Sequence, residues 1–409
     1  MRSRLEKRRR HYIKNSVVIT NGRVITPYRV LRESNVVVTD GIITEVFSGS
    51  YKKRSDELVI DAQNNYVSPG FVELHTHGAG GSDFMDGNID AVIEGCRAHM
   101  EYGTTSIMPT TLTSTDEELF ENLGNIEKVR DLSQKDLPSI IGIHLEGPYF
   151  DKEQHGAQDV SFIKNPVAKE YLNLVEKFPS IKRWTVAPEL PGAFQMGAEL
   201  SKRGIVMSIG HSNADEKAME LAIENGFSLV THQFLGMSRL KRENSEFKLG
   251  VAEMALILDA LSVEVIADGK HLPPSLIKLI YKVKGPEKIC LVTDSIRAAG
   301  MINGESIIGS LSKGQKVIVE DGVAYMPGKT SFGGSVATAD RLIRVMVNEV
   351  GVPLHEAIMM MSTTPAKIMG LNSSIGSIGL GKDGDIIVFD ENINLKVIIN
   401  KGNIFKNKL

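Results

Sequence analysis

The sequence has few cysteines, little net charge and no long apolar run, and each shortage excludes a class of protein. Its 409 residues include two cysteines, Cys96 and Cys290, which are far apart and lack the spacing of a metal site. This favours a reducing compartment over a disulfide framework, so we expect a cytoplasmic protein. The formal net charge of −3 gives no electrostatic basis for binding nucleic acid or a membrane surface.

We expect neither a targeting segment nor a membrane-spanning segment. No window reaches the roughly 18 apolar residues of a membrane-spanning helix. The basic start, "MRSRLEKRRRHYIKN", has no apolar stretch behind it that is long enough for a signal peptide. We interpret residues 1–14 as a flexible basic arm. The remaining chain, with a composition of 42% hydrophobic and 24% charged residues, is typical of one large globular domain with a smaller one.

β-rich segments occur at both ends of the chain. Short β-branched runs lie between Ser16 and Ile60, and Asn21-Gly22 and Asp40-Gly41 interrupt them with dipeptides that suit tight hairpin turns. The same pattern returns after Gly384. The sequence therefore predicts one small β-sandwich domain built from residues 15–65 and 371–409, which flanks a catalytic domain over residues 66–370.

Between these ends, apolar strand-like runs alternate with helical periodicity. The candidate strands cover residues 71–77, 105–111, 140–147, 183–189, 205–211, 229–234, 263–269 and 289–295. Eight such repeats over roughly 300 residues predict a closed (β/α)8 TIM-like barrel, with a doubly wound open sheet as the alternative. A further hairpin is expected over residues 317–326, with its turn at Asp321-Gly322.

Ionisable side chains lie at the carboxyl ends of these strands, which share one rim in a barrel. His75 and His77 are two residues apart, so on a strand both point to one face and can chelate. Glu146, His211 and His232 end three further strands. Imidazole and carboxylate are common ligands for zinc or iron, which predicts a divalent metal site with one or two ions. A structural ion pair at Glu146 and ordinary core histidines are the alternative.

Further candidates lie on the same rim. Asp294 follows an apolar strand and could act as a general acid/base or as a metal ligand. Asp268 could cap a turn or belong to the site, and His271 is expected to contact substrate. The glycine-rich loop over residues 327–340 places Ser335 as a helix N-cap, where backbone amides could hold an anion or an acyl oxygen.

Together these segments resemble a known family. The blocks, in order, are "PGFVELHTHGAGGSDFMDG", "HLEGPYF", "IGHSNA", "THQFLGM", "IADGKHLPP" and "LVTDSIRAAG". They are similar to those of the N-acetylglucosamine-6-phosphate deacetylases of the amidohydrolase superfamily, over roughly residues 16 to 400. The resemblance implies a divalent metal held by Glu146, His211 and His232, with Asp294 as the general acid/base. It also implies a homodimer and, because His75 and His77 are kept, a possible second ion.

Three departures from the family pattern fall on the substrate side. Gln158, with His155 nearby, stands where the family has a histidine that polarises the substrate carbonyl. Leu235 and Gly236 replace an asparagine and an alanine that meet the phosphate and sugar. The expected arginine has no clean counterpart, although Arg242 lies in a basic stretch close by.

The resemblance thus implies an enzyme that hydrolyses the N-acetyl group of an amino-sugar phosphate, with N-acetylglucosamine-6-phosphate as the leading substrate. The alternatives are an amidohydrolase for another N-acyl substrate, such as N-acetylgalactosamine-6-phosphate, an unphosphorylated N-acyl sugar or an N-acyl amino acid, and a non-catalytic metal-binding barrel. A cyclic-amide hydrolase is disfavoured, because strand four ends in "APE" without the bridging lysine of that branch.

Overall fold

A computed structural model describes residues 16–132, 134–329 and 331–409. The basic arm predicted for residues 1–14 lies outside the described residues. No helix within the described ranges is long and apolar enough to cross a membrane.

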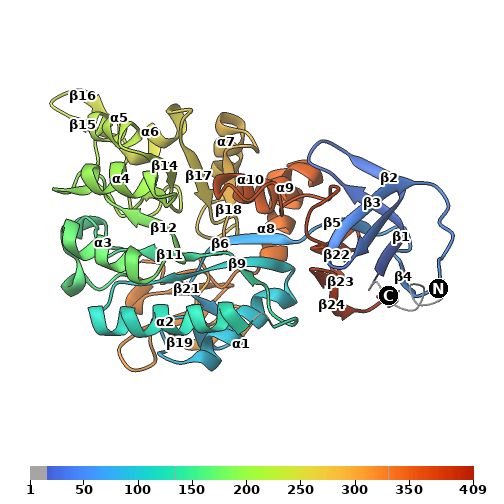
Figure 1. The fold of residues 1–409 in the computed structure, drawn as a ribbon. Coiled ribbons are helices and arrows are strands. Elements are labelled where there is room, and N and C mark those ends of the chain that lie inside the picture. The colour runs from blue at the N-terminus through green and yellow to red at the C-terminus, as the bar shows by residue number, and fades with distance from the viewer. Residues whose placement is uncertain (1–15, 133, 330) are drawn as a thin grey trace, which may run out of the picture.

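The larger part of the molecule is a barrel of eight parallel strands, with its helices on the outside (Figure 1). The strands are β6 (Phe71–Thr76), β9 (Thr104–Thr111), β11 (Ile143–Glu146), β12 (Ile181–Val186), β13 (Val206–Ile209), β14 (Phe227–Val230), β17 (Ser262–Val265) and β18 (Ile289–Leu291). They pair in chain order from β6 to β18, and each predicted strand corresponds to one of them. The predicted (β/α)8 barrel is confirmed, and the open doubly wound sheet is not the fold.

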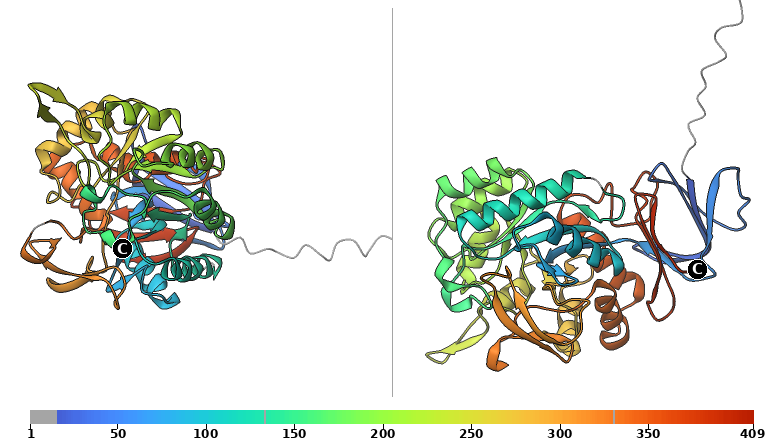
Figure 2. Two further views of the ribbon diagram at one scale, coloured as in Figure 1. Left: turned by 90° about the vertical axis from the view of Figure 1, so that its left-hand side faces the viewer. Right: turned by 90° about the horizontal axis from the view of Figure 1, so that it is seen from below.

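Most of the crossover helices bury an apolar face against the barrel, and α1 and α5 also begin at side-chain caps. The side chains of Asn88 and Asp215 accept from the backbone N–H of Ala91 and Ala218, which caps α1 and α5. The helices are α1 (Ile89–Glu101), α2 (Asp116–Leu132), α3 (Ala168–Lys177), α4 (Ala193–Lys202), α5 (Glu216–Glu224), α6 (Val251–Ile257), α7 (Pro274–Lys284), α8 (Ala339–Val345), α9 (Leu354–Met361) and α10 (Thr363–Ile368). Figure 2 shows the terminal sheet beside the helix-covered barrel.

The barrel closes between its first and last strands through the loop that follows β18. The backbone N–H of Asp294 donates to the carbonyl of His75 at 2.9 Å, and the N–H of His77 donates to the carbonyl of Ser295 at 2.8 Å. The closure therefore lies at the rim where the sequence places its candidate site.

The inside of the barrel near this rim is polar. Arg183 on β12 and Glu264 on β17 form an ion pair, and neither side chain is exposed to solvent. Arg183 also donates to Ser208, Thr231 and the carbonyl of Leu74, so each nitrogen of its guanidinium has a hydrogen-bond partner. A buried charge is costly unless it is paired, and this pairing is what permits charge at the barrel axis.

Both ends of the chain join in one eight-stranded sheet beside the barrel. Its strands are β1 (Ser16–Ile25), β2 (Val30–Thr39), β3 (Ile42–Ser48), β4 (Glu57–Asp61), β5 (Tyr66–Pro69), β22 (Ile386–Phe389), β23 (Leu395–Asn400) and β24 (Asn403–Asn407). Residues of most of these strands share one apolar cluster. The backbone N–H of Gly384 donates to the carbonyl of Gly41 at 2.7 Å, so the sheet curls towards closure around that cluster.

Strand β5 links the two parts. It pairs with β1 and β22 in the terminal sheet and continues through Gly70 into β6 of the barrel. A Cβ atom at Gly70 would lie 2.0 Å from Oγ1 of Thr105, so no larger residue fits this crossing. Because β5 pairs in the terminal sheet, we propose residue 70 rather than residue 65 as the end of that domain's first segment.

One predicted turn is wrong and two are confirmed. Asn21-Gly22 is not a hairpin: β1 runs through it with register irregularities, and the chain reverses later, where the N–H of Thr26 donates to the carbonyl of Arg29. Bulges and turns both use residues with positive φ, so the dipeptide alone does not distinguish them. Asp40-Gly41 joins β2 to β3 as expected.

The hairpin predicted over residues 317–326 is also present. Strands β20 (Gln315–Glu320) and β21 (Val323–Tyr325) turn at Asp321-Gly322, and β19 (Gly304–Ile308) adds a third strand. The remaining short strands are β7 (Gly78–Ala79), β8 (Ser82–Asp83), β10 (Ser139–Ile140), β15 (Lys241–Glu243) and β16 (Glu246–Lys248).

Candidate active site

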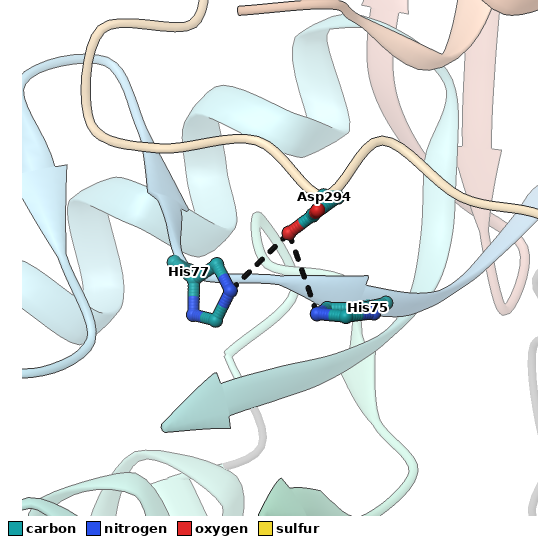
Figure 3. A group of neighbouring side chains, drawn as sticks. All are labelled: His75, His77 and Asp294. Atoms are coloured by element: carbon teal, nitrogen blue, oxygen red, sulfur yellow. Dashed lines mark ion pairs between the residues drawn. The ribbon is translucent and has the colours of Figure 1, made fainter. Parts of the chain in front are cut away.

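Two histidines and an aspartate meet at the closure of the barrel. His75 and His77 project from the carboxyl end of β6 towards Asp294, which lies on the loop after β18 (Figure 3). Oδ1 of Asp294 is 3.3 Å from Nε2 of His75 and 3.2 Å from Nε2 of His77. We call these three residues the first triad, and their potential ligand atoms all lie within 4.8 Å of one another.

A second group lies beside the first. Glu146 ends β11, and His211 and His232 follow β13 and β14. Oε1 of Glu146 is 3.2 Å from Nε2 of His211 and 3.1 Å from Nε2 of His232. We call these residues the second triad. All three are buried, and their potential ligand atoms also lie within 4.8 Å of one another.

Glu146 belongs to both groups through its two oxygens. Oε1 faces the imidazoles of the second triad and, at 3.5 Å, Nε2 of His75. Oε2 faces Nε2 of His77 at 3.2 Å. A carboxylate placed in this way can serve two neighbouring cations, one with each oxygen.

The hydrogen bonds on the far side of the imidazole rings fit a cation. Nδ1 of His211 donates to the carbonyl of Gln154 at 2.8 Å, and Nδ1 of His232 donates to that of Leu235 at 3.2 Å. With the proton on Nδ1, each Nε2 carries a lone pair. These two Nε2 atoms are only 3.2 Å apart, and two lone pairs at that distance require a proton or a metal ion between them.

His75 follows the same rule. Its Nδ1 donates to Oε2 of Glu264 at 3.0 Å, while its buried Nε2 has no hydrogen-bond partner among the described residues. The chemistry of the donor set, three oriented imidazoles with nearby carboxylates, therefore fits a divalent metal ion.

Burial and charged neighbours shift the pKa values of these groups in opposite directions. Burial alone would lower the pKa of His77, but hydrogen bonds to Asp294 and Glu146 raise it to about 9. Burial alone would raise the pKa of Glu146, but the imidazoles of His75, His211 and His232 hold it well below its usual range. The carboxylate is therefore ionised, and protons and metal ions compete for the same imidazole lone pairs.

Three of the site residues adopt a backbone conformation that glycine favours. The φ angles are 50° for His211, 29° for His232 and 45° for Asp294. Such residues cost on the order of 1–3 kcal/mol each and persist where the surrounding structure fixes them. The carbonyl of His211 accepts from Asp151, and that of Asp294 accepts from Ser335. The chain leaves its strands by these sharp turns, which aim the side chains inwards.

A cavity of about 470 Å³ opens above the two triads. Five of the six triad residues line its floor, and Gln158, Leu235, Gly236 and His271 line its walls. Nδ1 of His271 donates to Oδ2 of Asp268 at 2.8 Å, which leaves Nε2 as an acceptor. The larger apolar side chains of the wall are those of Leu112, Phe234, Leu235, Leu272, Pro273, Leu276, Ile308 and Phe332.

Other substrate-side predictions are placed differently. Arg242 lies on the exposed strand β15, with its guanidinium 5.9 Å from the ring of Phe247, and it does not line the cavity. Arg239 lines it instead. His155 lies just behind the wall, where Nδ1 donates to the carbonyl of Gln158 at 3.0 Å.

Ser335 is buried and is not the N-cap of α8, because that position is taken by Thr338. Its Oγ accepts from the N–H of Ala337, and its backbone bonds the loop of Asp294. Ser335 therefore supports the general acid/base candidate from behind and does not reach the cavity.

Sequence reasoning missed the residues that orient the first triad. Oε2 of Glu264 accepts from Nδ1 of His75 and, at 3.2 Å, from the backbone N–H of His232. Burial alone would raise the pKa of Glu264, but Arg183 and His75 lower it to about 2. The signal in the sequence was a single glutamate in the apolar run "SVEVIA" and a single arginine at the start of "RWTVAPE". Only the structure shows that these two residues form an ion pair.

Comparison with known proteins decides the family. The amidohydrolase family model matches residues 66–407. The chain belongs to the amidohydrolase family. This amidohydrolase is 31% identical over 400 residues to an N-acetylglucosamine-6-phosphate deacetylase of Lysinibacillus sphaericus, which covers 95% of this chain and 97% of that protein. It is 29% identical to the Bacillus subtilis enzyme of the same name, with 95% and 97% of the two chains covered.

Solved structures agree with this assignment. The N-acetylglucosamine-6-phosphate deacetylase of Pasteurella multocida superimposes on this amidohydrolase with a TM-score of 0.88 at 29% identity, covering 96% of this chain and 100% of that chain. A single-site variant of the Mycobacterium smegmatis enzyme, in complex with N-acetyl-D-glucosamine-6-phosphate, gives a TM-score of 0.87 at 26% identity, with the same coverage.

Proposed function

We propose that this amidohydrolase is a metal-dependent N-acetylglucosamine-6-phosphate deacetylase, which releases acetate and the free amino-sugar phosphate. The observation that carries the proposal is the meeting of two histidine–carboxylate triads, joined by Glu146, on the floor of one cavity. The relatives named above, which carry that activity, support the choice of substrate.

The second triad would hold one divalent ion, and the first triad would hold another when two are bound. We propose zinc or iron, because imidazole and carboxylate ligands suit both. The bound metal supplies Lewis acidity, which lowers the pKa of a water and polarises the acetamide carbonyl.

Asp294 is the proposed general acid/base. Burial alone would raise its pKa, but His75 and His77 lower it, so the carboxylate is ionised at neutral pH. Oδ1 or Oδ2 can accept a proton from the attacking water and return it to the leaving amine nitrogen. The closure hydrogen bond from its backbone N–H to His75 holds it over the floor of the cavity.

The remaining wall residues would bind substrate. Gln158 can donate its second amide N–H, the one not bonded to Glu146, to the acyl oxygen, and His271 can accept from a sugar hydroxyl because Asp268 holds its proton on Nδ1. We place Leu235 and Gly236 against the sugar, and Arg239 is the one arginine among the described residues that line the cavity.

The test is acetate release by metal-loaded protein from a panel of N-acetylated sugars, each with and without a 6-phosphate. We expect the highest kcat/KM for N-acetylglucosamine-6-phosphate. No acetate from any member, with a full metal content, would refute the enzyme and favour a metal-binding barrel.

A second candidate is deacetylation of an unphosphorylated or otherwise different N-acyl amine. The lining of the cavity favours this candidate, because Arg239 is the one arginine there that could bind a phosphate. Its guanidinium already donates to the carbonyl of Phe234. Equal kcat/KM for the phosphorylated and plain sugars in the same panel would select this candidate.

We further propose a cytoplasmic homodimer. Both cysteines are buried free thiols, which supports a reducing compartment. Light scattering in solution tests the oligomeric state.

A further inference from the structure

Gln158 is fixed at both ends of its side-chain amide. Its Oε1 accepts from the backbone N–H of Thr113 at 2.9 Å, and its Nε2 donates to Oε2 of Glu146 at 2.8 Å. The first contact settles which end of the amide is oxygen, because a backbone N–H can only donate. An N–H of Gln158 therefore points at the shared carboxylate.

The main chain of Gln158 is held just as firmly. Its N–H donates to the carbonyl of His155 at 2.9 Å, and its own carbonyl accepts from Nδ1 of His155 at 3.0 Å. The side chain is buried, with 4% of the residue exposed. Gln158 is therefore a rigid donor and not a surface side chain that happens to lie near the site.

This donor acts on one oxygen of Glu146 and not on the other. Oε1 faces His211 and His232, whereas Oε2 receives Gln158 and faces His77. A carboxylate oxygen has two lone pairs. With one engaged by Gln158, the other stays directed at the first triad, and rotation of the carboxylate about its last bond is blocked.

We propose that Gln158 is a positioning residue that makes Glu146 a bridge, so that it controls occupancy of the first triad by a second metal ion. Without this donor, Glu146 keeps Oε1 on the second triad but no longer holds Oε2 towards His77 and Asp294. Partners that orient metal ligands are typically worth about 10–100-fold in metal affinity.

The experiment titrates metal-free protein with Zn²⁺ and measures stoichiometry and both dissociation constants. It compares the wild type with Gln158→Leu, which is apolar and cannot donate, and with Gln158→Asn, which keeps an amide but is too short to span Thr113 and Glu146. Ser161→Ala is the matched control, because Ser161 lies on the same loop and its hydroxyl bonds only Asp159 among the described residues.

In Gln158→Leu we expect the second ion to bind at least about tenfold more weakly, while the first ion keeps its affinity. Gln158→Asn should show a smaller loss of the same kind, and Ser161→Ala should bind both ions as the wild type does. Thermal unfolding of the metal-free proteins checks that each variant is folded. If Gln158→Leu does not fold, the metal affinities of Gln158→Asn test the proposal.

Equal weakening of both ions would indicate general loosening of the loop and overturn the proposal. Unchanged binding of the second ion, or a wild type that takes only one, would overturn it too. The inference rests on the metal site of the proposed function but not on its substrate. A wild type that binds two ions and releases no acetate would refute the deacetylase alone.

Discussion

Two buried carboxylates, in different regions of the molecule, have pKa values shifted in opposite directions. Inside the barrel, Glu264 is fully buried against Arg183 and His75, and its pKa is lowered to about 2. At the junction of the barrel with the terminal sheet, burial raises the pKa of Asp385 to about 7. Its Oδ1 accepts from the backbone of Lys401, and its Oδ2 has no hydrogen-bond partner in the described part of the chain. Both carboxylates are buried, so it is the charged partners of Glu264, and not burial, that distinguish it from Asp385.

Among the carboxylates of the barrel, we expect the largest effect from a substitution of Asp294. We expect Asp294→Asn to lower kcat by about a thousandfold, because the amide cannot accept the proton of the attacking water. The ion of the second triad, measured on the same preparation, should be retained, because Glu146, His211 and His232 remain. Turnover close to the wild-type rate would exclude Asp294 as the general base.

The next largest effect is expected where the buried pair is broken. Glu264→Gln leaves Arg183 as an unpaired buried charge, which should lower the free energy of unfolding by about 3–5 kcal/mol. Denaturant unfolding of the metal-free protein measures this loss. Glu264→Gln combined with Arg183→Met is the control and should recover much of the stability. If Glu264→Gln were as stable as the wild type, the charged partner Arg183 would not be what distinguishes Glu264 from Asp385.

The same pair predicts loss of stability in acid. Because the pKa of Glu264 is lowered on folding, its contribution is present above the unfolded value of about 4.3 and is lost as pH falls towards 2. Between pH 5 and 2.5, the free energy of unfolding of the metal-free wild type should therefore fall more steeply with decreasing pH than that of Glu264→Gln. Parallel curves would mean that Glu264 does not titrate in this range.

Asp385 at the junction should contribute a pH dependence of stability that is opposite in sign to that of Glu264 and smaller. The pKa of Asp385 is raised on folding, so its favourable contribution is present below about pH 4 and is lost as pH rises through about 7. The charged groups that act on it are Asp383, which raises the pKa, and Lys401, which lowers it.

We expect Asp385→Asn to stabilise the protein by about 1–2 kcal/mol at pH 8.5 and to change its stability little at pH 4. Thermal unfolding at the two pH values measures the difference, and kcat should be unaffected. A variant that is less stable at pH 8.5 would show that the ionised carboxylate has a partner after all.

The sequence allowed the barrel and the meeting of the triads to be predicted, because strand ends are visible as polar residues after apolar runs. His211, His232 and Asp294 all follow such runs, and parallel strands bring their ends to one rim. The paired charges Arg183 and Glu264 could not be foreseen in the same way. They come from strands far apart in the chain, and their partnership exists only across the closed barrel.

Loop positions were the least predictable part of the site. Arg239 and Arg242 are equivalent in the sequence, yet one lines the cavity and the other lies on an exposed strand. Ser335 looks like a helix cap, but the helix begins later. Side chains on loops are placed by tertiary contacts, and local propensity does not encode these contacts.

The closure hydrogen bonds between β6 and the loop after β18 give the molecule a seam. The first triad straddles this seam, because His75 and His77 lie on one side and Asp294 lies on the other, whereas the second triad sits on strands joined by continuous pairing. If this seam opens in a local fluctuation, the strands that carry the second triad stay paired. The general base and the second ion would then be lost while the more tightly held ion stays in place, so inactivation could precede unfolding and be reversed by reclosure.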